Sequence, residues 1–139
     1  MNRNTTERST LHFDGRHAVS KYKRAQALED GVLVEVPLEI AELSAFKWPI
    51  ALTAGAWAAC VDWPADDKTD NEPDRVFEVL KDAWMAVRRM DRASASAHFS
   101  TTRRIPRQAL PSDVPLTVYV GPGDDGEPVI TIALRSEES

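Results

Sequence analysis

Two stretches near the C-terminal end of the sequence constrain the fold most. Residues 116–120 and 129–134 carry apolar side chains at every second position, and the connector between them holds three glycines and two prolines. A three-residue loop at 124–126 would put Gly126 in the left-handed conformation that such a hairpin needs. The resulting register places three apolar pairs on one face of a β-hairpin: Val120 with Ile130, Val118 with Ile132, and Leu116 with Leu134.

Helical and strand-like periodicities alternate along the rest of the chain. Apolar residues recur at helical spacing over 74–90, which predicts an amphipathic helix of four turns. Shorter elements are expected as helices at 21–30, 38–46 and 49–62 and as strands at 32–36 and 97–105. These elements predict a small α+β domain with three to four helices packed on an antiparallel sheet that ends in the C-terminal hairpin.

A length of 139 residues fits one domain. The first residues are polar and lack periodicity, so residues 1–20 are expected to form a flexible tail. The globular domain is then expected over 21–135, with a short disordered tail at 136–139.

Few residues have the types and spacings that chemistry requires. Cys60 is the single cysteine, cannot form an internal disulfide, and lies among apolar neighbours, which indicates a buried hydrophobe. His12, His17 and His98 have no companions at metal-ligand spacing, and His98 beside Ser96 is a weak hint of catalysis. We therefore expect no catalytic residue, no metal and no cofactor, and a cryptic enzyme is the least favoured alternative.

The sequence also indicates a compartment. No signal peptide is recognisable, and the longest weakly polar run is too short to cross a bilayer. We expect a cytoplasmic protein without a membrane partner.

Charge alternates in blocks along the chain. Residues 1–28 and 83–107 are net basic, whereas 29–82 and 108–139 are net acidic, and the total is −5. Blocks of this kind either neutralise each other within the fold or form patches offered to partners, and both readings stay open. A sequence pI near 5.2 argues against sequence-independent nucleic-acid binding, for which a basic domain is typical.

Two surfaces are candidates if the charges face outward. The acidic candidates for binding a partner come from a polar loop and from the hairpin turn: Asp66, Asp67, Asp70, Glu72, Asp124, Asp125 and Glu127. The basic candidates are all arginines, which suit bidentate recognition of phosphate: Arg88, Arg89, Arg92, Arg103, Arg104 and Arg107.

Three segments carry a resemblance to a known family. They are residues 24–36 (RAQALEDGVLVEV), 46–61 (FKWPIALTAGAWAACV) and 121–134 (GPGDDGEPVITIAL). With these motifs the chain resembles the small "plasmid-related protein" family, a domain of unknown function carried on bacterial plasmids, integrative elements and prophages. The resemblance supplies no catalytic residues, and what it implies is that the protein is cargo of mobile DNA.

The expected function follows from size, charge and that resemblance. We expect a non-enzymatic interaction protein that binds a host or rival protein complex. Its sharpest form is an inhibitor of a host defence complex, of the anti-CRISPR or anti-restriction type, whose acidic surface mimics nucleic acid. The alternative is a nucleic-acid-binding accessory or regulatory protein that uses the arginines, and the oligomeric state is left open.

Overall fold

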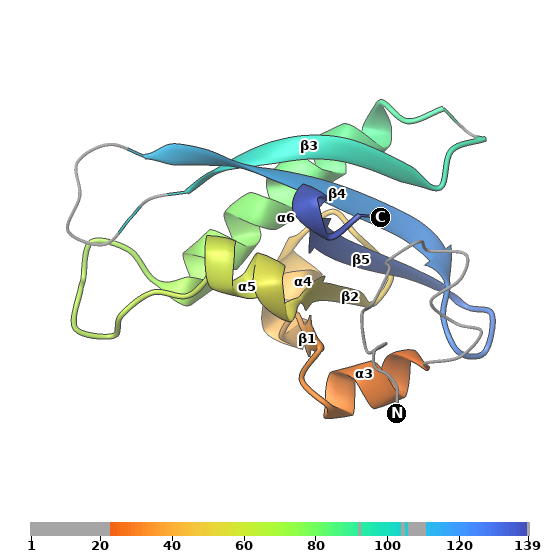
Figure 1. Cartoon of the computed structure of the whole chain (residues 1–139), viewed down its shortest axis with the longest axis horizontal. Helices are drawn as coiled ribbons and strands as arrows, with labels where there is room; N and C mark the ends of the chain where they lie inside the picture. The colour runs from red at the N-terminus through yellow and green to blue at the C-terminus, as the bar shows by residue number, and fades with distance from the viewer. Residues whose placement is uncertain (1–22, 92, 104, 106–110, 139) are drawn as a thin grey trace.

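The computed structural model describes residues 23–91, 93–103, 105 and 111–138, so the tail predicted at 1–20 lies outside the described residues. These residues form an α+β domain with a five-stranded sheet in the order β1-β2-β5-β4-β3 (Figure 1). The elements in chain order are α3 (Arg24–Glu29), β1 (Leu33–Glu35), α4 (Leu38–Leu43), β2 (Ile50–Thr53), α5 (Ala54–Cys60), α6 (Glu72–Arg88), β3 (Ser96–Arg103), β4 (Ser112–Pro122), β5 (Pro128–Leu134) and the 3₁₀ turn η1 (Arg135–Glu137).

The C-terminal hairpin has the predicted register. Strands β4 and β5 pair Val120 with Ile130, Val118 with Ile132 and Leu116 with Leu134. Gly126 has a φ of 84°, and the N–H of Gly123 donates to the carbonyl of Glu127 at 2.6 Å. The three-residue loop at 124–126 is therefore confirmed, because those two bonded residues flank it.

One predicted helix is wrong in its first turn. Residues 50–53 form strand β2 inside the sheet, between β1 and β5, antiparallel to β1 and parallel to β5. The side chain of Thr53 then accepts a hydrogen bond from the N–H of Ala56 at 3.0 Å, which caps α5. The helix expected at 49–62 is thus divided into a buried strand and a shorter helix, and the sheet is mixed rather than antiparallel.

The helices cover the sheet unequally. Helices α4, α5 and α6 pack on one face, and the main apolar core lies there, with Leu52, Leu80 and Ile132 fully buried at its centre. On the other face α3 covers a smaller cluster of Ala27, Leu33, Ala51, Tyr119 and Ala133. Figure 1 shows α6 behind strands β3 and β4 and α3 at the opposite end of the sheet.

Residues 136–139 were expected to form a disordered tail, and the structure describes 136–138 of them. Instead Arg135–Glu137 form η1, which follows β5 and lies against β4 (Figure 1). One carboxylate oxygen of Glu137 accepts from the hydroxyl of Thr53 at 2.7 Å and from the N–H of Leu134 at 2.8 Å. These bonds attach residues 135–138 to the domain.

Candidate functional site

The acidic hairpin turn joins α3 to the sheet. The carboxylate of Asp124 accepts hydrogen bonds from the N–H of Arg24 at 2.7 Å and from the N–H of Ala25 at 3.0 Å. The first N–H groups of a helix have no partner within the helix, and a carboxylate there also interacts favourably with the helix dipole. Asp124, which we expected to contact a partner, therefore caps α3 from a segment about a hundred residues away.

The Arg24 side chain completes this junction. Its guanidinium donates to the hydroxyl of Thr131 at 2.7 Å and to the carbonyl of Ile130 at 2.9 Å. The pKa of Asp124 is lowered, first by the hydrogen bond from Ala25 and further by the one from Arg24. Burial lowers the pKa of Arg24, against the raising effect of Glu35 and Asp124. Arg24 and Asp124 therefore interact favourably through their charges, while their hydrogen bonds go to other groups.

The acidic loop between α5 and α6 is held by a buried arginine. Arg75 is 5% exposed, and its guanidinium lies 4.8 Å from the ring centroid of Trp63. Its Nη1 is 3.4 Å from a carboxylate oxygen of Asp70, and its Nε donates to the carbonyl of Val61. Asp70 therefore has a partner within the fold.

The other acidic candidates differ in their exposure to solvent. Asp67 accepts from the N–H and the hydroxyl of Thr69. Glu72 is half-buried in the first turn of α6, and the exposed members are Asp66, Asp125 and Glu127.

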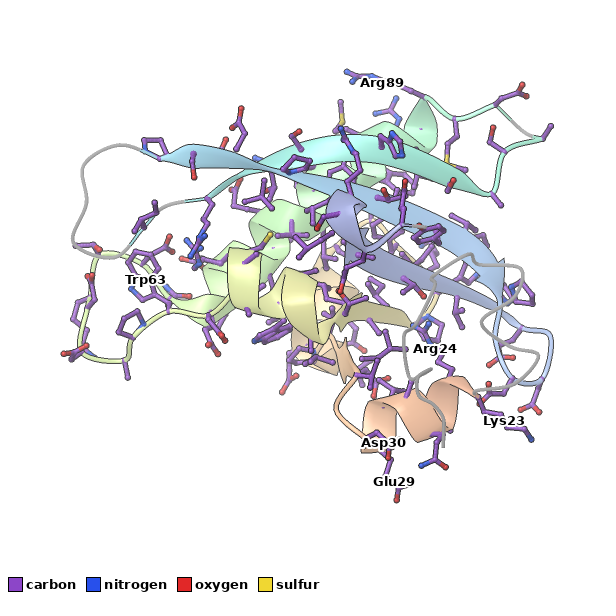
Figure 2. All side chains as sticks on the ribbon, in the orientation of Figure 1. Lys23, Arg24, Glu29, Asp30, Trp63 and Arg89 are labelled. Carbon is purple, nitrogen blue, oxygen red and sulfur yellow. The ribbon has the colours of Figure 1, made fainter. Side chains whose placement is uncertain are left out.

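The structure does not join the described arginines into one patch. Arg88 and Arg89 are exposed at the end of α6, where Figure 2 shows Arg89 outside the body of the fold. Arg103 ends β3, an eight-residue strand that spans about 26 Å at 3.3 Å per residue. Because β3 runs back along α6, Arg103 lies at the opposite end of that strand from Arg88 and Arg89. Arg92, Arg104 and Arg107 lie outside the described residues.

Strand β3 is an open edge of the sheet. The N–H of Val120 donates to the carbonyl of Ala95 at 2.8 Å. Bonded and non-bonded pairs alternate along an antiparallel ladder, and Pro115, which lacks an N–H, faces Ser100 at a non-bonded position. The N–H and C=O groups that point away from β4 therefore belong to Ser96, His98, Ser100 and Thr102. Within the described part of the chain, no strand pairs with them.

A groove of about 580 Å³ runs beside this edge. It lies between the second half of α6 and the first half of β3. Its lining combines apolar side chains, Met85, Met90 and Phe99 among them, with polar ones that include Asp82 and Arg89. Methionine side chains adapt to different partner shapes, which suits a binding surface. The sequence predicted β3 but gave no sign that it would be an edge strand.

The groups with possible chemistry have structural partners. His98 Nε2 lies 3.1 Å from both carboxylate oxygens of Glu138, which also accepts from the hydroxyl of Thr117. The Thr117 bond is the largest cause that lowers the pKa of Glu138. Cys60 is buried as predicted, and burial raises its pKa to about 11, which suppresses the reactive thiolate at neutral pH.

Two further findings concern the described residues alone. No group of three or more His, Cys, Asp or Glu side chains in this part of the chain could hold a metal ion. None of the helices that the structure describes is long and apolar enough to cross a membrane.

Comparison with known proteins gives one match. A model described as a family of unknown function, DUF6573, matches residues 10–138, which is most of the chain. No match is found among curated proteins or among solved structures.

Proposed function

We propose that this chain, which belongs to the DUF6573 family of unknown function, is a non-enzymatic domain that binds another protein along the open edge of β3. One observation carries the proposal: among the described residues no strand pairs with the outer backbone groups of this edge, and they lie directly beside a groove of about 580 Å³ with apolar and polar lining. Native proteins usually shorten, cover or charge such edges, because an exposed edge pairs readily with another strand. Here the edge strand is eight residues long.

The finer form of the proposal gives the protein a biological setting. The resemblance of its motifs to plasmid-related proteins supports a role as cargo of a mobile genetic element in the cytoplasm. For such cargo, the partner is a host or rival protein complex, and inhibition of a defence complex is the sharpest version. The net charge of −5 and the exposed Asp66, Asp125 and Glu127 support mimicry of nucleic acid as a secondary contribution.

A second candidate function is nucleic-acid binding. The exposed pair Arg88 and Arg89 favours it, because arginine forms bidentate hydrogen bonds with phosphate. Against it, Arg103 lies apart from this pair, at the other end of β3. Binding by phosphate contacts would weaken steeply between about 50 and 200 mM salt.

Affinity capture of the tagged protein from host lysate tests the proposal. Half of the lysate is treated with nuclease before capture, and bound proteins are quantified by mass spectrometry. We expect a protein bound at near-equal stoichiometry that survives nuclease. Enrichment that disappears after nuclease would replace the proposal with the nucleic-acid alternative, and the absence of any enriched protein would contradict both.

A further inference from the structure

We infer that the segment received by β3 is an extended acidic peptide of the partner, which adds a sixth strand to the sheet beside Ser96–Arg103. The inference rests on the proposed function and specifies the chemistry of the partner. It draws on three features of this edge: the backbone groups, the two different sides of the strand, and the charges at its ends.

The backbone groups fix the extended form of the ligand. Ser96, His98, Ser100 and Thr102 offer N–H and C=O groups at alternate positions along the edge. A segment satisfies such a row only if its own backbone is extended, as in β-strand addition. A helix satisfies its backbone groups internally and would leave the row unpaired.

The two sides of the edge fix the pattern of the ligand. Alternate side chains of an added strand point to opposite faces of the sheet. On the α6 face they would meet the groove with Met85, Met90 and Phe99. On the other face they would lie beside His98, whose side chain is 56% exposed. The ligand is therefore expected to alternate apolar residues with polar ones.

The charges at the ends of the edge favour an acidic ligand. Arg88 and Arg89 are exposed at the end of α6 next to the start of β3, and Arg103 ends the strand. Asp82 lines the groove and accepts from the hydroxyl of Thr101 at 2.8 Å, Glu138 bonds to His98, and Asp91 accepts from the N–H of Ala93. At the far end Asp113 faces Thr102 beside Arg103. Carboxylates of a ligand would therefore find the exposed arginine pair Arg88 and Arg89 at the start of the edge.

Selection from a displayed library of random dodecapeptides tests the inference on the full-length protein. We expect enriched peptides that alternate apolar with polar residues and that carry Asp or Glu at the end that lies beside Arg89. Their binding, measured by fluorescence polarisation with synthetic copies, should weaken about tenfold or more in Arg89→Glu. The matched control Lys68→Glu makes the same charge change on the exposed loop far from the groove and should leave affinity within about twofold.

A second pair of variants tests the backbone pairing. Ser100→Pro removes an N–H that points away from β4, so pairing with β4 is kept and binding should fall at least about tenfold. Ser100→Ala keeps the N–H and should bind normally, and thermal melts verify that both variants fold. No enrichment, peptides without acidic residues, or equal binding by Ser100→Pro and Ser100→Ala would overturn the inference. If lysate capture still yields a nuclease-resistant partner in that case, the proposed function survives and only the acidic strand is refuted.

Discussion

Removal of the Asp124 carboxylate tests how the charge blocks are used in this fold. Asp124 lies in the hairpin turn and accepts the N–H groups of Arg24 and Ala25 at 2.7 and 3.0 Å. In Asp124→Ala these two donors at the start of α3 lose their acceptor. Arg24 also loses a nearby negative charge that stabilises its partly buried guanidinium.

The size of the effect follows from these contacts. Loss of an N-cap acceptor costs about 1 kcal/mol of folding free energy, within a range of about 0.5–2 kcal/mol. The upper half of that range is expected because two N–H groups are involved. For a domain of this size we expect the melting temperature to fall by about 3–7 °C. Asp125→Ala is the matched control, since it removes an exposed carboxylate from the same turn, and it should stay within about 0.5 kcal/mol of wild type.

The assay is calorimetric melting at pH 7 and again across the acid range. The pKa of Asp124 is lowered in the folded state, so its charge stabilises the fold above the unfolded pKa of about 3.9. The contribution is lost as pH falls through the lower folded value. The difference in melting temperature between wild type and Asp124→Ala should therefore disappear in strong acid. Equal melting temperatures of Asp124→Ala and Asp125→Ala at pH 7 would refute the capping role.

Three further predictions concern groups inside the fold. Cys60 should not react with Ellman's reagent at pH 8 in the native protein, because it is buried with a pKa of about 11, and should react fully in guanidinium. Arg75→Ala should lower the urea-derived free energy of unfolding by about 2–3 kcal/mol, since it removes the stacking on Trp63, the hydrogen bond to the carbonyl of Val61 and the ion pair with Asp70. Carbon-detected NMR titration should place the pKa of Glu138 below its usual range, and Glu138 should stabilise the fold only above that pKa.

The hairpin was predictable because its information is local. The register depends on apolar residues at every second position and on a glycine at a position that needs positive φ, which Gly126 supplies with a φ of 84°. The long helix α6 was likewise predictable from its apolar periodicity, with bounds that differ by two residues at each end. Each of these two elements is formed by one continuous segment of the chain.

Strand β2 was missed because its sequence is locally ambiguous. Ile50, Ala51 and Leu52 follow Pro49, which is acceptable in the first turn of a helix, and a short apolar run fits either a buried strand or a helix. Parallel pairing with β5 decides the outcome, and that pairing joins segments about eighty residues apart. No pattern within the local sequence predicts this parallel pairing.

The candidate surfaces were predictable only as lists of charged residues. Local sequence shows that Asp124 is acidic and lies in a turn, but not that the start of α3 comes within hydrogen-bond distance of it. It shows basic Arg88 and Arg103, but not that β3 separates them. The open edge is the hardest feature to foresee, because the position of β3 depends on the order of all five strands.

Binding of a protein partner along the open edge of β3 can be tested by quantitative capture from nuclease-treated host lysate with three matched baits: the wild-type protein, Ser100→Ala and Ser100→Pro. We expect wild type and Ser100→Ala to retain the same partner and Ser100→Pro to lose about nine-tenths of it, since only proline removes the outward N–H. Equal recovery of that partner by all three baits would contradict the claim.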